Sequence, residues 1–157
     1  MTYLVDTPVL LRLANTSDLQ YPVAYRAVLT LHHQAVPLHI APQNLIEFRN
    51  AATRPVSDNG LGFSPDVAEQ KAAAFEALFP LLPDTADIYP AWKTLVHAAG
   101  IIGKQVHDAR LVAICHVYAI PHVLTFKVRH FARLAAFGPR LVVVHPADVG
   151  TPPGASS

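Results

Sequence analysis

Short apolar runs of three to five residues recur along the chain, and a segment with helical periodicity separates each run from the next. Runs this short are typical of strands buried on both faces, because a buried helix needs a longer apolar segment. The predicted strands are residues 3–5, 38–40, 122–126 and 141–144. The predicted helices are residues 7–14, 22–34, 43–54, 68–82, 89–99, 106–119 and 129–136. This alternation predicts an α/β domain with a mostly parallel sheet.

Size and composition predict a single folded domain. The chain has 157 residues, of which 52% are apolar, which is enough for one sizeable core. We expect the domain to span residues 1–146 and the Pro-, Gly- and Ser-rich residues 147–157 to form a flexible tail. No apolar run approaches the roughly 20 residues needed to span a bilayer, and the N-terminus lacks the basic region of a signal peptide. We therefore expect a cytoplasmic protein without a membrane partner.

Charge is distributed unevenly along the chain. Residues 1–87 carry five basic and nine acidic side chains, whereas residues 88–147 carry seven basic side chains and one acidic side chain, Asp108. A basic half is typical of proteins that bind phosphate groups, although a solvated basic surface has the same composition. A single carboxylate within a basic segment suggests a specific role for that group.

Three carboxylates stand out by their positions. Asp6 follows a predicted buried strand, Glu47 lies inside a helix beside an apolar residue, and Asp108 lies near the start of the most apolar helix. Taken singly, each has a simpler explanation: a helix cap, a solvated side chain and an acid that complements a helix dipole, respectively. If the three carboxylates lie close together, a cation is needed to offset their mutual repulsion. Mg²⁺ and Mn²⁺ are hard ions that prefer oxygen ligands. Such an ion suits phosphodiester hydrolysis.

The sequences around these residues resemble one known family. The segments are YLVDTPVLLRL, which contains Asp6 and Thr7; APQNLIEFRNAATRP, which contains Glu47; and GKQVHDARLVAICHVYAIPHVLTFKVRHFARL, which contains Asp108 and Thr125. In order, spacing and flanking apolar residues they resemble the PIN-domain nucleases, and most closely the VapC-type toxin ribonucleases of VapBC toxin–antitoxin systems. The resemblance covers roughly residues 2–144.

The resemblance implies a fold, an activity and a set of partners. The implied fold is a PIN-like three-layer sandwich with a central, mostly parallel sheet flanked by helices. The implied activity is that of a Mg²⁺- or Mn²⁺-dependent endoribonuclease, the toxin of a type II pair with a small VapB-like antitoxin, and commonly a homodimer. By matching positions, Asp6, Glu47 and Asp108 are the expected catalytic, metal-binding residues, and Thr7 and Thr125 are expected to line the site.

Basic residues near these motifs in the sequence are candidates for RNA binding. They are Lys104, Arg110, Arg129 and Arg133. Arg and Lys contacts to phosphate give affinity that depends on salt and little on base sequence.

One residue departs from the family pattern. Lys127 stands two positions after Thr125, where the family usually carries Asp or Asn, and a protonated ammonium cannot ligate a metal. Lys127 could point away from a single-metal site, form an ion pair with Asp6 or Asp108 in place of a second metal, or displace metals altogether. Because three carboxylates remain, the first two arrangements are favoured. We therefore predict a metal-dependent endoribonuclease.

Two other functions compete with this prediction. The substitution at Lys127 motivates a degenerate, non-catalytic PIN fold that acts as an RNA- or protein-binding module. A phosphatase with Asp6 as its nucleophile is a weaker alternative, because Pro8 occupies the position where that class requires a second Asp.

Overall fold

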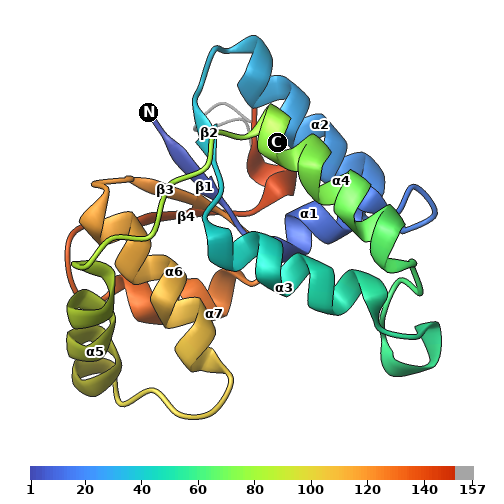
Figure 1. The fold of residues 1–157 in the computed structure, drawn as a ribbon. Coiled ribbons are helices and arrows are strands. Elements are labelled where there is room, and N and C mark those ends of the chain that lie inside the picture. Colours follow the sequence, from blue (N-terminus) through green and yellow to red (C-terminus); the bar gives the residue numbers. More distant parts are fainter. Residues whose placement is uncertain (151–157) are drawn as a thin grey trace.

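A four-stranded parallel sheet lies at the centre of the molecule (Figure 1). A computed structural model describes residues 1–150. The strands are β1 (Tyr3–Val5), β2 (Leu38–His39), β3 (His122–Leu124) and β4 (Val142–Val144), in the spatial order β2-β1-β3-β4. Every neighbouring pair runs parallel. The predicted α/β class is therefore confirmed.

Helices cover both faces of the sheet (Figure 1). One layer contains α1 (Thr7–Ala14), α2 (Tyr21–His33), α3 (Pro42–Thr53) and α4 (Pro65–Leu78). The opposite layer contains α5 (Ile88–Ala99), α6 (Gln105–Val117) and α7 (Val128–Ala135). Two short 3₁₀ helices, η1 (Val56–Asp58) and η2 (Pro146–Asp148), complete the described elements.

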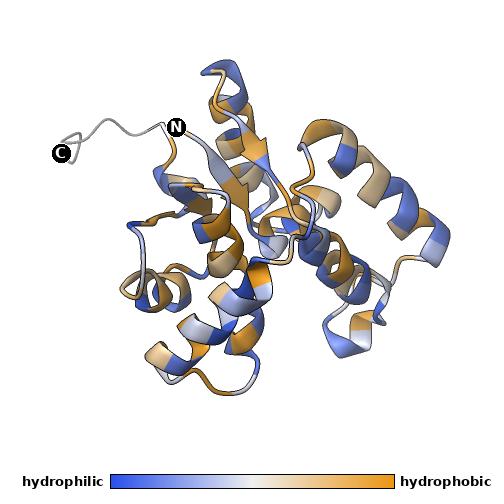
Figure 2. Ribbon diagram, turned by 60° about the vertical axis from the view of Figure 1, so that its left-hand side comes forward, coloured by the Kyte–Doolittle hydropathy of each residue, from blue (hydrophilic) through white to orange (hydrophobic). Residues whose placement is uncertain are grey.

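Alternation of side chains along β1 creates two hydrophobic cores. Tyr3 and Val5 pack into the core shared with α1 to α4, whereas Leu4 packs into the core shared with α5 to α7. Successive side chains of a strand point to opposite faces, so a central strand must be apolar throughout. Figure 2 shows hydrophobic residues along the central strands and hydrophilic residues on the outer parts of the helices. Asp6, which directly follows β1, is therefore placed at the carboxyl edge between the two cores.

Helix α4 lies earlier in the chain than the predicted 68–82 segment. Ser64 caps it by accepting a hydrogen bond from the Val67 N–H, and the helix ends at Leu78. Pro80 disfavours the helical conformation of the residue before it. Residues 80–82 instead run beside Ile40, where the Ile40 N–H donates to the Pro80 carbonyl and the Leu82 N–H donates to the Ile40 carbonyl. This segment therefore extends the edge of the sheet next to β2.

The C-terminal segment begins with an ordered turn. Residues 146–148 form η2, which contacts α2. The rest of the predicted flexible tail, residues 151–157, lies outside the described residues. Within residues 1–150, no helix combines the length and the hydrophobicity needed to cross a membrane.

Candidate active site

The site is built where β1 and β3 end side by side. Val5 of β1 pairs with Leu124 of β3, so the next residues, Asp6 and Thr125, are neighbours at the carboxyl edge of the sheet. The Thr125 hydroxyl donates a hydrogen bond to Asp6 Oδ2 at 2.7 Å. Both side chains are fully buried. Thr125 thus fixes the orientation of the Asp6 carboxylate.

Asp6 combines two of the roles considered for it. Its Oδ1 accepts a hydrogen bond from the Thr7 N–H at 2.9 Å, which caps α1, and its Oδ2 faces the site. The pKa of Asp6 is raised to about 7, chiefly by burial and to a smaller extent by the Asp108 and Glu47 carboxylates, while Lys127 and the Thr125 hydroxyl act against this shift. A carboxylate in this position favours a nearby cation.

The cation next to Asp6 is the ammonium group of Lys127. Its Nζ lies 2.6 Å from Asp108 Oδ1 and 4.0 Å from Asp6 Oδ2. Burial alone lowers the pKa of Lys127, but the Asp6, Asp108 and Glu47 carboxylates raise it overall, so the side chain stays protonated. Of the arrangements considered for Lys127, the structure shows the side chain turned towards the aspartates and not away from the site.

Glu47 reaches the site from α3 and is held by two hydrogen bonds. Its Oε2 accepts from the Thr7 hydroxyl at 3.2 Å, and its Oε1 accepts from the Gln43 amide at 2.6 Å. The buried Asn44 amide donates in turn to the Thr7 hydroxyl at 3.1 Å. Glu47 is therefore oriented by its neighbours, and its position differs from that of a freely solvated helix residue. Gln43 and Asn44 were missed in the sequence because amides inside a helix carry no distinguishing pattern.

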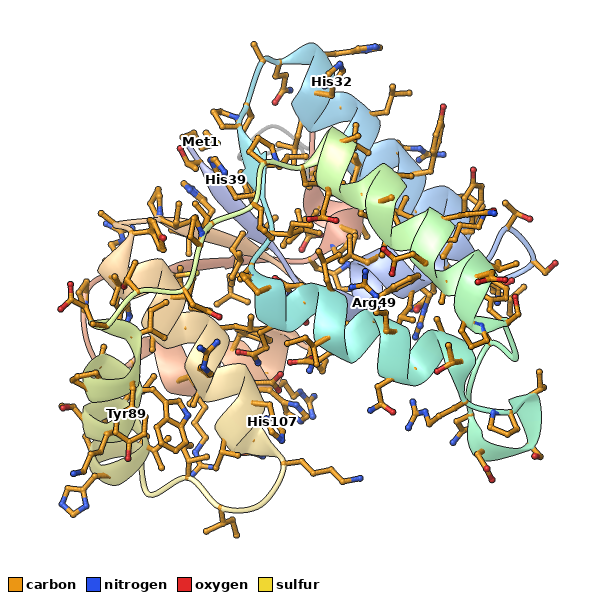
Figure 3. The ribbon with its side chains drawn as sticks, viewed as in Figure 1. Met1, His32, His39, Arg49, Tyr89 and His107 are labelled. Carbon is orange, nitrogen blue, oxygen red and sulfur yellow. The ribbon has the colours of Figure 1, made fainter. Side chains whose placement is uncertain are left out.

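A cleft of about 600 Å³ opens beside these groups. Its lining includes two of the three acids, Glu47 and Asp108, together with Thr7 and Lys127. Asp6 and Thr125 do not line it, because both are fully buried. Figure 3 shows His107, another lining residue, at the start of α6.

The predicted RNA-binding residues are distributed unevenly around this cleft. Lys104 lines it, and Arg110 lies next to it, donating hydrogen bonds to Gln43 and to Asp84. Arg129 and Arg133 are absent from its lining, although His130 of the same helix lines it. The guanidinium of Arg133 instead donates to the Gln105 side chain and the Ala99 carbonyl.

Two further basic residues, Arg54 and His130, line the cleft. Arg54, at the end of α3, lies far in sequence from the basic half of the chain. His130 follows Lys127 by three residues, and its Nδ1 lies 3.8 Å from Asp108 Oδ2. The run of basic residues in the sequence indicated the region of His130, but no sequence signal distinguished Arg54.

The carboxylates suit a divalent cation in donor type and in charge. Three oxygen-bearing acids face a single ammonium group, which leaves surplus negative charge of the kind that Mg²⁺ and Mn²⁺ neutralise. Among residues 1–150, however, no three acid, histidine or cysteine side chains are grouped closely enough to hold a metal. Lys127 occupies the space between Asp6 and Asp108. The carboxylates therefore suit a divalent cation in donor type, but in this arrangement they are not grouped as a metal site.

The parallel sheet, the two helical layers and the acidic carboxyl edge define a class of fold, the PIN-like fold of VapC-type proteins. The structure of VapBC2 from Rickettsia felis, bound to a promoter DNA fragment, matches with a TM-score of 0.68 at 15% identity, over 92% of this chain and 98% of that one. The Mycobacterium tuberculosis toxin VapC20, which cleaves the sarcin–ricin loop, matches with a TM-score of 0.62 at 21% identity, over 83% and 93%.

A third similar structure is FitAB bound to the IR36 DNA fragment, with a TM-score of 0.65 at 15% identity, over 92% of this chain and 95% of that one. No protein-family model and no curated protein sequence matches this chain. At such identities the similarity establishes the fold alone. The three-layer, PIN-like fold implied by the sequence motifs is thus confirmed.

Proposed function

We propose that this protein is a metal-dependent endoribonuclease and the toxin of a type II toxin–antitoxin pair. One observation carries the proposal: Asp6 and Asp108 converge on the Lys127 ammonium at the carboxyl edge of the sheet. A cleft lined by basic residues lies beside them. Functional groups of open α/β folds gather at this edge. Like-charged carboxylates are costly to bring together unless they bind a cation or a substrate bearing one.

The side chains of the cleft have distinct proposed roles. Asp6, Glu47 and Asp108 would hold Mg²⁺ or Mn²⁺, which when bound would stabilise negative charge on the scissile phosphate and activate water. Thr7 and Gln43 orient Glu47, as their hydrogen bonds require. Lys127, displaced from the aspartates, is long enough to turn towards an RNA phosphate.

The RNA backbone would be attracted by basic side chains around the same cleft. Lys104 and Arg54 line it, and Arg110 lies at its margin. Such contacts bind phosphate without regard to base sequence, so affinity should fall steeply as salt is added. Arg129 and Arg133 would contact only RNA that extends beyond the cleft.

We further propose that a small antitoxin covers this cleft, that the toxin forms a homodimer and that it acts in the cytoplasm. The similar structures from Rickettsia felis and of FitAB are complexes bound to DNA, which supports an antitoxin partner for this chain. An antitoxin that contributes a cation or a covering segment would neutralise the same carboxylates that Lys127 now contacts.

Expression in bacteria without an antitoxin tests the function without a guess at the substrate. We expect growth arrest and new RNA 5′ ends at a small number of sites. Purified protein should reproduce those cleavages with Mn²⁺ and lose them with EDTA. Normal growth and intact RNA at equal protein levels would contradict the proposed nuclease.

The ion pair of Lys127 favours a second candidate, a non-catalytic RNA-binding module. In that case the ammonium replaces the metal permanently, since it lies within hydrogen-bonding distance of Asp108. RNA binding would then be equally strong with Mn²⁺ and with EDTA, and no cleavage would accompany it. The same purified protein therefore separates the two candidates.

Lys127→Asn is expected to tighten Mn²⁺ binding about 10- to 100-fold. The substitution removes a positive charge that lies within 4.0 Å of two carboxylates and supplies an oxygen donor instead. Calorimetric titration with Mn²⁺ measures the change. Lys104→Asn is the matched control, because Lys104 lines the same cleft and should shift the affinity far less. Equal Mn²⁺ affinities of wild type and Lys127→Asn would show that the ammonium and the metal do not compete.

A further inference from the structure

A second, smaller cavity lies beside the cleft. It has a volume of about 290 Å³ and is lined by Tyr89 and Trp92 of α5 and by Val106, His107 and Arg110 of α6. His107 lines both cavities, so the two lie next to each other. Figure 3 shows Tyr89 and His107 on the same side of the molecule. We call this smaller cavity the aromatic pocket.

The two aromatic rings of this pocket are held in a defined arrangement. Their centroids are 5.7 Å apart with an interplanar angle of 31°. The indole N–H of Trp92 donates to the Val106 carbonyl at 2.8 Å, which fixes the orientation of that ring. Tyr89 is 63% exposed. An exposed aromatic ring beside a fixed one is a stacking surface.

Arg110 connects the aromatic pocket to the acidic site. Its guanidinium donates to the Gln43 side chain at 3.1 Å, and the Gln43 amide holds Glu47. A second hydrogen bond and ion pair with Asp84 immobilises the other end of the guanidinium. Arg110 is thus a planar cation held between the aromatic rings and the carboxylates, where it can contact either a phosphate or the face of a base.

We propose that the aromatic pocket binds one nucleobase of a single-stranded RNA whose phosphate lies in the adjoining cleft. This proposal rests on the proposed RNA-directed function. Stacking on Tyr and Trp rings and on Arg guanidinium planes is the common way in which proteins hold unpaired bases. The volume is near the lower limit of small-molecule sites, which suits a single base. The surrounding half of the chain, residues 88–147, carries seven basic side chains and one acidic side chain, as a polyanion requires.

The fluorescence of Trp92 reports directly on this pocket, because it is the only tryptophan of the chain. The probe is a short, fluorescein-labelled 2′-O-methyl oligouridine, which resists cleavage, and a matched strand without bases is the control. Binding is measured by fluorescein anisotropy and stacking by quenching of Trp92 in separate titrations with unlabelled strands. We expect the oligouridine to quench Trp92 and the strand without bases to bind with little quenching.

Substitution of Tyr89 provides the second arm of the test. Tyr89→Leu should weaken binding of the oligouridine about 5- to 20-fold, while Tyr89→Phe, which keeps the ring, should bind like wild type. Tyr25→Leu is the matched control, because Tyr25 is also an exposed tyrosine, stacked on Tyr21 in α2. None of the three is expected to affect folding, since the altered rings are solvent-exposed.

The outcomes separate this inference from the function on which it rests. Binding without quenching, together with a Tyr89→Leu affinity equal to wild type, would overturn the nucleobase pocket and leave RNA binding intact. A Tyr89→Leu variant that no longer binds the antitoxin but still binds RNA like wild type would also overturn the nucleobase pocket. That result would identify a protein-docking surface. Absence of any RNA binding would refute the proposed function as well.

Discussion

Asp108→Asn is expected to lower RNA cleavage about 100-fold or more and to relieve the growth arrest caused by the wild-type protein. Asp108 Oδ1 accepts the 2.6 Å hydrogen bond from Lys127, and its Oδ2 faces His130 at 3.8 Å. An amide in its place removes a negative charge from the proposed metal set and leaves the Lys127 ammonium with Asp6 as its remaining aspartate. Loss of one such oriented group typically costs two to three orders of magnitude. Cleavage rates with Mn²⁺ measure the effect.

Asp66→Asn is the matched control for this substitution. Asp66 lies exposed in the first turn of α4 and is absent from the lining of the cleft, so the same change of charge there should leave cleavage unaltered. Asp108→Asn protein that cleaves RNA at the wild-type rate would refute the proposed nuclease site. Unaltered RNA binding by the same variant would show that the lost activity is not a failure to bind substrate.

Asp6→Asn is expected to stabilise the folded protein at pH 8 while abolishing cleavage. The pKa of Asp6 is about 7 in the folded protein, against about 4 in an unfolded chain. Between these values the unfolded chain loses its proton first, so stability falls as pH rises from about 4 to 7 and then levels off. The asparagine variant does not lose stability in this way, because its side chain does not ionise. Its gain at pH 8 should be on the order of 2–4 kcal/mol, or roughly 5–10 °C in Tm.

Thermal denaturation of both proteins across this pH range measures the gain. At about pH 3, where Asp6 is largely protonated in both the folded and the unfolded state, the wild type and Asp6→Asn should have similar Tm values. The hydrogen bond from the Thr7 N–H to position 6 survives the substitution, because the asparagine side chain keeps one carbonyl oxygen. A lower Tm of Asp6→Asn at pH 8 would show instead that Lys127 makes the ionised carboxylate a net stabilising group.

The fold could be predicted from the sequence because its elements carry local patterns. The short apolar strands and the longer periodic helices alternate as they do in the structure. The predicted strands at residues 3–5 and 122–126 supply the two central strands, β1 and β3, although β3 ends at Leu124. The error at α4 arose because the Ala-rich helix was extended to Leu82, past Pro80, which disfavours a helical conformation of the residue before it. There the decisive interaction is tertiary: residues 80–82 pair with Ile40, which no local pattern reveals.

The side-chain geometry of the site was less predictable. Asp6 and Thr125 follow from the rule that functional groups follow parallel strands, and the structure places them side by side. The direction of the Lys127 side chain depends on the charge of residues from α6 and β1, so its sequence position alone left it undetermined. Arg133 lies six residues after Lys127 and yet contacts residues of other elements, because proximity in sequence does not set the face of a helix.

The aromatic pocket escaped detection for a related reason. Tyr89 and Trp92 are three residues apart, a spacing that in a helix places both on one face and is usual for core residues. The sequence does not show that this face turns towards α6 only in part and leaves Tyr89 exposed. Phe131, by contrast, is fully buried.

The ammonium group between Asp6 and Asp108 also has a genetic consequence. Lysine codons and asparagine codons differ only in their third base, so a single nucleotide exchange at position 127 replaces a resident cation with a neutral oxygen donor. The backbone N–H of residue 127 would keep its hydrogen bond to the Thr125 hydroxyl in either case, since that bond does not involve the side chain. A single mutation therefore separates a site whose positive charge is a lysine side chain from a site that would need a bound metal ion to supply that charge.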